Sequence, residues 1–179
     1  MSIPKNNPLA RRSLAELKIR SRILLKAADQ QQPNALKILS STTRTDPPYK
    51  LKDALKSVAR TAGFKDWQHA RYVLGGSAQI GEDMGDIWYS VKCHGLLNIW
   101  CRNYGEAREQ LEKQEGYFLF PYKTQFIVAN DAYVNALGVE TGHKLRQSEN
   151  RDLVATYGSS YWDDLTFLRL QEAMGRPAG

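Results

Sequence analysis

The chain has 179 residues, of which 42% are hydrophobic and 25% are charged, as is typical of a globular protein. Its apolar runs are too short to cross a bilayer, and two cysteines cannot form a disulfide framework. The polar N-terminus lacks the apolar stretch of a secretory signal. We therefore expect a cytoplasmic protein with no membrane contact.

The net charge of +6 conceals an uneven distribution along the chain. Residues 1–75 contain 15 Lys and Arg against 5 Asp and Glu, a net charge of +10. The remaining residues contain 10 against 14, a net charge of −4. This division indicates either a front half that meets a polyanion or two halves that neutralise each other across an internal interface.

The first elements are a flexible basic arm, expected over residues 1–12, and a helix that follows to about residue 28. Ser13 and Glu16 have the spacing of a capping box, in which the two side chains satisfy exposed amides at a helix start. Lys18, Arg22 and Lys26 lie four residues apart and would form one positive stripe on this helix. The stripe is either a solvated face or a surface for an anionic partner.

Three further helices are expected before the middle of the chain, at 33–39, 51–62 and 66–74, with a loop at 40–49. Pro33 suits a first helical turn, Gly63 suits a left-handed helix terminator, and Asp66 can cap the last of the three. Gly75-Gly76 then interrupts the pattern and is the expected boundary. The predicted domains are therefore a helical module at 13–75 and a second domain at 77–179.

The helices at 51–62 and 66–74 also have the outline of a DNA-reading helix-turn-helix, with Gly63 in the turn. His69 stands where that motif expects a buried apolar residue. On this hypothesis Lys65 contacts phosphate, and the base or backbone contacts come from the second helix, through Trp67, Gln68, Arg71 and Tyr72.

The same segment resembles a short helical module of many bacterial proteins, often found ahead of ankyrin repeats or in chains of unknown function. The shared pattern is L-x-D-A…A-R-x-x-G-F-x-x-W, carried here by Leu51, Asp53-Ala54, Ala59-Arg60, Gly63-Phe64 and Trp67. The likeness covers about residues 14–74, and nothing similar to ankyrin repeats follows. The resemblance implies an architecture: Phe64 and Trp67 fill a small helical core, while Ala59 and Gly63 allow close helix approach.

The second half has strand-type and helical stretches in turn. Residues 86–93 and 96–102 predict a hairpin that turns at His94-Gly95. Helices are expected at 104–114, 132–137, 151–157 and 161–174, with a polar loop after 138. Residues 117–129 predict one or two strands, with an edge or a break near Pro121. The predicted class is α+β: a basic N-terminal helical module, then a small, mostly antiparallel sheet with helices packed on one face.

Cys93, His94 and Cys101 are the candidate metal ligands, with His143 or His69 as a fourth. An adjacent Cys-His pair is not a standard zinc spacing, and no third group is apparent to orient a catalytic thiolate. We predict no cofactor and no catalytic residue, and keep a small enzyme or metal-assisted protein as an alternative.

An aromatic stretch offers a third candidate site. It contains, around Lys123, the residues Tyr117, Phe118, Phe120, Tyr122 and Phe126. Aromatic side chains interleaved with a cation can stack on single-stranded nucleic acid, but they more often form core, and Tyr is also frequent in protein interfaces. The acidic charge of this half favours the core.

The leading prediction is a non-catalytic binding or adaptor protein whose basic helical module contacts nucleic acid or an acidic protein surface. The second alternative is a protein-recognition module of the inhibitor or toxin-partner type, which would use the aromatic second domain. The predicted contact residues are the cations Arg11, Arg12, Lys18, Arg22, Lys26, Lys52, Lys56, Arg60, Lys65 and Arg71. The oligomeric state is left open.

Overall fold

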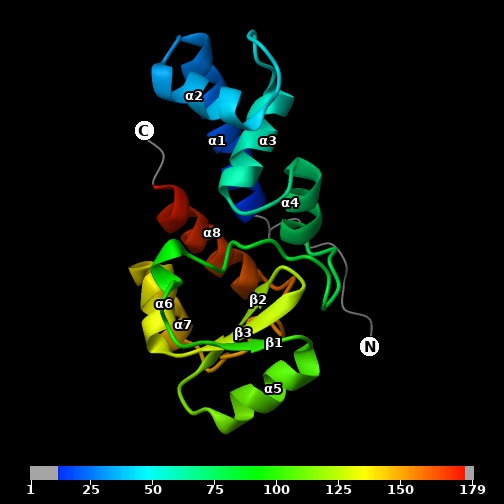
Figure 1. Cartoon of the computed structure of the whole chain (residues 1–179), viewed down its shortest axis with the longest axis vertical. Helices are drawn as coiled ribbons and strands as arrows, with labels where there is room; N and C mark the ends of the chain where they lie inside the picture. Colours follow the sequence, from blue (N-terminus) through cyan, green and yellow to red (C-terminus); the bar gives the residue numbers. More distant parts are fainter. Residues whose placement is uncertain (1–11, 176–179) are drawn as a thin grey trace.

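A computed structural model of the chain describes residues 12–175 and confirms the α+β class, with helices and one small antiparallel sheet (Figure 1). The predicted arm lies outside these residues except for Arg12, which begins the first helix. The elements, in chain order, are α1 Arg12–Asp29, α2 Pro33–Thr42, α3 Leu51–Thr61, α4 Trp67–Leu74, the 3₁₀ turn η1 Val91–Cys93, β1 Ile99–Cys101, α5 Tyr104–Lys113, β2 Phe118–Tyr122, β3 Gln125–Ala129, α6 Asp131–Leu137, α7 Val139–Gln147 and α8 Ser160–Met174.

Helices α1 to α4 gather at one end of the molecule, and the sheet lies toward the other end (Figure 1). The four helices match the predicted ranges closely, and Asp66 caps α4 by accepting the His69 N–H at 2.8 Å. The predicted capping box at the start of α1 is wrong. Ser13 lies inside the helix and donates to Asp163, while Glu16 forms a buried ion pair with Arg20 at 2.8 Å.

The turn between α3 and α4 explains the glycine at position 63. Gly63 has φ +98°, and a Cβ there would lie 2.3 Å from Asp86 Oδ1 and 2.9 Å from the Ile87 nitrogen. The close approach therefore comes from the loop at residues 85–87 rather than from a helix, as the resemblance implied. Phe64 and Ala59 are buried as expected, and Trp67 is partly buried against the same core.

The predicted hairpin at 86–102 is wrong, because only Ile99–Cys101 of this stretch forms a strand. Ile87 and Trp88 are buried one after the other, without the alternation of a half-buried strand. The carbonyl of Trp88 accepts a hydrogen bond from the Tyr133 hydroxyl at 2.5 Å, and those of its neighbours accept from Arg169. The apolar composition of this segment thus reflects burial in the core rather than strand pairing.

The sheet has the order β1-β3-β2, with both pairs antiparallel. Strands β2 and β3 are two strands in the stretch 117–129, where one or two were expected, and they pair as a hairpin; Pro121 lies in the edge strand β2, as predicted. Helices cover both faces of the sheet instead of the expected one. Helix α5 packs over Cys101, Phe126 and Val128, while the other face joins the main core beneath α6 and α8.

Two predictions for the C-terminal part are also wrong. The stretch after Gly138, expected as a polar loop, contains helix α7, and residues 151–157, expected as a helix, form turns. Helix α7 begins under the carboxylate of Glu172, which accepts from the Glu140 N–H at 2.7 Å and from the Thr141 hydroxyl at 2.5 Å. The backbone near Leu153 instead pairs with Leu119 of β2.

Helix α8 contacts both ends of the molecule through two charged side chains, Asp163 and Arg169, which lie six residues apart. Asp163 accepts from the backbone N–H groups of Arg12 at 2.6 Å and of Ser13 at 3.2 Å, and so caps α1. Arg169 donates to the carbonyls of Ile87 at 2.9 Å, Leu137 at 3.0 Å and Tyr89 at 3.1 Å. These bonds fix α1, α6 and the loop at 87–89 against one helix.

The largest hydrophobic cluster contains residues from both sides of the predicted boundary at Gly75-Gly76. Leu14 and Leu17 of α1 belong to the same cluster as Trp162 and Leu165 of α8. The helical module and the α+β part therefore share one core.

Candidate functional site

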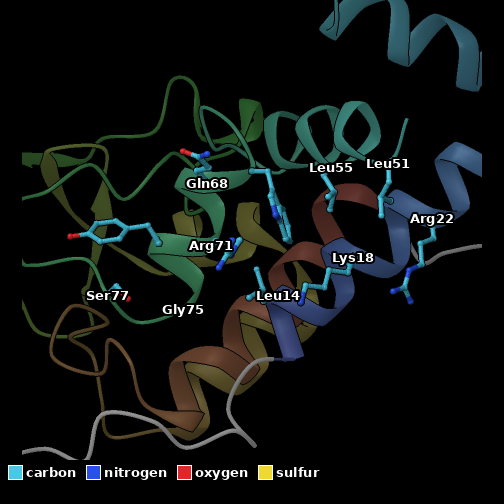
Figure 2. Close-up of a pocket in the computed structure, with 11 residues that line it drawn as sticks. Leu14, Lys18, Arg22, Leu51, Leu55, Gln68, Arg71, Gly75 and Ser77 are labelled. Carbon is cyan, nitrogen blue, oxygen red and sulfur yellow. The ribbon is translucent and has the colours of Figure 1, made fainter. Parts of the chain in front are cut away.

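A groove of about 750 Å³ lies between helices α1, α3 and α4 (Figure 2). Each of these helices contributes side chains to it, and the chain just after α4 closes one end. The lining residues are Leu14, Lys18, Arg22, Leu51, Leu55, Trp67, Gln68, Arg71, Tyr72, Gly75 and Ser77.

Helix α1 contributes Leu14, Lys18 and Arg22, which lie four residues apart and so share one face of the helix. Leu14 is buried, while Lys18 and Arg22 are exposed. Figure 2 shows Arg71 reaching from α4 toward this face of α1. The groove therefore carries positive charge on two of its walls.

Aliphatic and aromatic groups line the rest of the groove. Leu51 and Leu55 extend from α3 toward α1 (Figure 2), and Leu51 remains 42% exposed. Trp67, the first residue of α4, is partly buried against the core. The groove is thus amphipathic, with apolar groups beside three cations.

The three cations of the groove have no hydrogen-bonding or ionic partner within residues 12–175, and no Asp or Glu lines the groove among these residues. One lining residue does bind an acidic side chain: the Tyr72 hydroxyl donates to Glu82 at 2.8 Å. That hydrogen bond raises the pKa of Tyr72. The Gln79 N–H and the Tyr72 hydroxyl together lower the pKa of Glu82. Glu82 is thus ionised at neutral pH but turned toward protein donors.

The other predicted cations have different surroundings. Arg12 pairs with Asp164 at 2.9 Å, Lys65 pairs with Asp83 at 2.8 Å, and Arg60 donates to the carbonyls of Thr42 and Lys65, each at 3.1 Å. Lys26 and Lys52 are exposed and Lys56 is half-buried, all outside the groove lining, and Arg11 lies outside the described residues. The structure therefore gathers Lys18, Arg22 and Arg71 and separates the others.

His69 of α4 has a structural role beside the groove. Its Nδ1 accepts the Lys65 N–H at 3.1 Å, and its Nε2 lies 2.7 Å from the Asp83 carbonyl oxygen. These two bonds require the neutral tautomer with the proton on Nε2. The ring also contacts Phe64 edge-on at 5.7 Å, so it fills the position where a helix-turn-helix has an apolar residue. The proposed DNA-contacting residues of α4 all line the groove, where Trp67 is partly buried while Gln68, Arg71 and Tyr72 are exposed.

The candidate metal ligands are not brought together. Cys93 lies in the main core and Cys101 lies in the cluster under α5, on opposite faces of the sheet. His94 is exposed and stacks at 5.6 Å on Tyr89, and within residues 12–175 no three His, Cys, Asp or Glu side chains could share a metal ion. Burial raises the pKa of both thiols, which disfavours the thiolate.

Most of the aromatic stretch is core, since Phe118, Phe120 and Phe126 are buried. A smaller aromatic surface remains beside it, and sequence reasoning missed two of its members. Trp100 is 44% exposed and meets Tyr122 edge-on at 5.2 Å, while Tyr89 lies 5.2 Å from Tyr122. The failed hairpin prediction hid this grouping, because it assigned residue 89 to a strand.

Comparisons with known protein families, curated proteins and solved structures found no match to this chain. The resemblance to the bacterial helical module therefore stays a prediction. Among the described residues, no helix has the length and apolar character needed to span a membrane.

Proposed function

We propose that the protein is a non-catalytic binding protein that holds an anionic partner, a nucleic acid or an acidic protein surface, in the groove between α1, α3 and α4. The observation that carries the proposal is the set of Lys18, Arg22 and Arg71, which have no partner within residues 12–175 and lie beside an apolar lining. Like charges four residues apart destabilise a helix by a few tenths of a kcal/mol, so the pair on α1 does not serve the fold.

The contrast with the other cations supports the same assignment. Arg12, Arg60 and Lys65 each have a partner within the chain, and their role is accounted for by the fold. The groove cations face a concave surface, and positive charge in a cleft attracts anions more strongly than the same charge on a convex face.

The test is binding of labelled single-stranded DNA, duplex DNA, RNA and poly-glutamate across a salt series. The variant Lys18→Glu/Arg22→Glu/Arg71→Glu should abolish binding, because it reverses the groove charge. The matched control Lys26→Glu/Lys52→Glu/Lys56→Glu changes the net charge by the same amount, but outside the groove. It should keep most of the binding. Equal effects of the two triple variants would show that the groove has no special part.

The aromatic surface supports a second candidate function, protein recognition through the α+β part. Trp and Tyr side chains are enriched in protein interfaces, and the exposed Trp100 contacts the partly buried Tyr122, which in turn contacts Tyr89. Trp100→Ala would then weaken capture of a protein partner from a nuclease-treated lysate. Capture that survives this change but fails in the groove variant would favour the groove.

A further inference from the structure

The chemistry of the groove lining distinguishes between the two kinds of anionic partner. Leu14, Leu51 and Leu55 are aliphatic, and they match the aliphatic side chains of a protein. A nucleobase gains most by stacking on an aromatic face. The lining has three leucines but only two aromatic residues: Trp67, which is partly buried against the core, and Tyr72, which is 42% exposed and bound to Glu82 through its hydroxyl.

The cations have the spacing of successive helical turns. Lys18 and Arg22 are four residues apart on α1, which corresponds to about 6 Å along the helix axis. Carboxylates at positions i and i+4 of a second helix repeat at the same interval, so one such pair can meet both cations. Arg71 stands on the opposite wall, where it can meet an acidic side chain on the other edge of the same helix (Figure 2).

We propose that the occupant of the groove is an acidic amphipathic helix of a partner protein. Its apolar residues lie on the exposed Leu51 and the half-buried Leu55, and its flanking Asp or Glu residues pair with Lys18, Arg22 and Arg71. This inference rests on the proposed function and adds the class of partner. An amphipathic helix in an apolar groove is a common mode of peptide recognition, with anchors at i, i+3, i+4 and i+7.

The probe is a fluorescein-labelled peptide of about four helical turns, with leucines at i, i+3, i+4 and i+7 and glutamates on both flanks. Fluorescence anisotropy gives its Kd with the full chain at low salt. A second peptide has the same composition in scrambled order, so the charge is equal but no apolar face forms. Labelled single-stranded oligo-dT and a DNA duplex complete the set of probes.

Two protein changes test the two halves of the recognition. Lys18→Glu/Arg22→Glu/Arg71→Glu should weaken peptide binding by about tenfold or more, with Lys26→Glu/Lys52→Glu/Lys56→Glu as the charge-matched control. Leu51→Ser should weaken it by several fold, and Ile38→Ser is its control, since Ile38 is 41% exposed on α2, outside the groove, against 42% for Leu51. Circular dichroism and urea midpoints verify that each variant is folded.

The expected result is tight binding of the amphipathic peptide, weaker binding of the scrambled one, and loss in both groove variants but in neither control. Equal binding of the scrambled peptide would mean that the groove recognises charge alone. Groove-dependent binding of only oligo-dT or duplex would assign the partner to nucleic acid. Either outcome overturns this inference and leaves the proposed function standing. If no anionic probe bound, or if the two triple variants behaved alike, both would fail.

Discussion

Helix α8 and the α1–α3–α4 groove both contain charged side chains, but the surroundings of these side chains differ. On α8, Asp163 and Arg169 are buried, and each makes several hydrogen bonds to backbone groups of other elements. In the groove, Lys18, Arg22 and Arg71 are exposed and have no partner within residues 12–175. A buried charge without hydrogen bonds would cost several kcal/mol, so the α8 set must be satisfied for the chain to fold. The groove set is under no such constraint.

The comparison separates stability from binding. Changes on α8 should unfold the protein without acting directly on a ligand, and changes in the groove should affect ligand binding while the fold persists. Four variants test this division, two on α8, one at Tyr157 just before it and one in the groove, and they follow in order of decreasing effect on stability.

Arg169→Met should have the largest effect. It leaves the carbonyls of Ile87, Tyr89 and Leu137 without donors in the core, and each unsatisfied buried acceptor costs about 1–3 kcal/mol. We expect a loss of about 3–5 kcal/mol in the free energy of unfolding, measured by urea denaturation. Arg108→Met, on the exposed face of α5, is the control and should change the midpoint little. If Arg169→Met lowered the free energy of unfolding no more than Arg108→Met does, the three hydrogen bonds of Arg169 would not stabilise the fold.

Asp163→Ala should have the next largest effect on the free energy of unfolding. The carboxylate caps α1 from α8, and losing a capping side chain costs about 0.5–2 kcal/mol, with the buried Ser13 hydroxyl also losing its acceptor.

The neighbouring Asp164 is the natural control for this cap. Burial opposes ionisation of Asp164, but hydrogen bonds from Arg12 and Lys144 outweigh it and lower its pKa. Its stabilising contribution is therefore present above the ordinary value of 3.8 and is lost as the pH falls below it. Asp164→Ala should cost less than Asp163→Ala at pH 7 and reduce the acid sensitivity of unfolding. Equal losses would contradict the capping role of Asp163.

Tyr157→Phe should produce a smaller loss with a pH signature. The hydroxyl donates to the Val73 carbonyl at 2.6 Å and accepts the Ala78 N–H at 3.0 Å, so its removal costs about 1–2 kcal/mol at pH 7.

The pH dependence follows from the partial burial of Tyr157 against the main core. Burial raises the pKa of Tyr157 to about 12 from its ordinary value of 10.0. The protonated phenol therefore stabilises the fold fully below pH 10, and this contribution disappears as the pH rises through about 12. The variant should lose less stability over that interval than the parent, by thermal unfolding in alkaline buffers. Burial also raises the pKa of Tyr104 to about 12, so part of the loss of stability at high pH should remain in both the parent and the variant.

Lys18→Gln/Arg22→Gln should have the smallest effect on stability. These side chains have no partner to lose within the described chain, and the change removes a like-charge pair at i, i+4. The urea midpoint should stay the same or rise slightly, while binding of the anionic probes weakens. A clear fall in the midpoint would mean that these cations stabilise the fold after all.

The local pattern of the chain was enough to predict most of the front half. The apolar spacing in α1 and α3, Pro33 at the start of α2, Gly63 in its left-handed conformation and Asp66 at the cap of α4 are all short-range features. Their physical causes act within a few residues, so they can be read directly from the order of residues. The strands within 117–129 and the edge position of Pro121 were predicted in the same way, whereas the pairing of β2 with β3 was not.

The wrong predictions have one cause: these segments are stabilised by residues that lie far away in the sequence. The start of α1 depends on Asp163, and the start of α7 depends on Glu172, each more than 30 positions away. Residues around Trp88 have strand-type composition, but Arg169 and Tyr133 satisfy their carbonyls in place of a second strand. No local pattern records such partners.

The candidate site divides in the same way. The sequence by itself determined that the front half is basic and that Lys18 and Arg22 share one face of a helix, because charge and helical period are properties of the order of residues. Only the tertiary structure decided that Arg71 lines the same groove as this pair, while Arg12, Arg60 and Lys65 are held by partners within the chain. Which cations remain unpaired depends on the packing of α1 against α3 and α4, and packing depends on contacts between residues that are distant in the sequence.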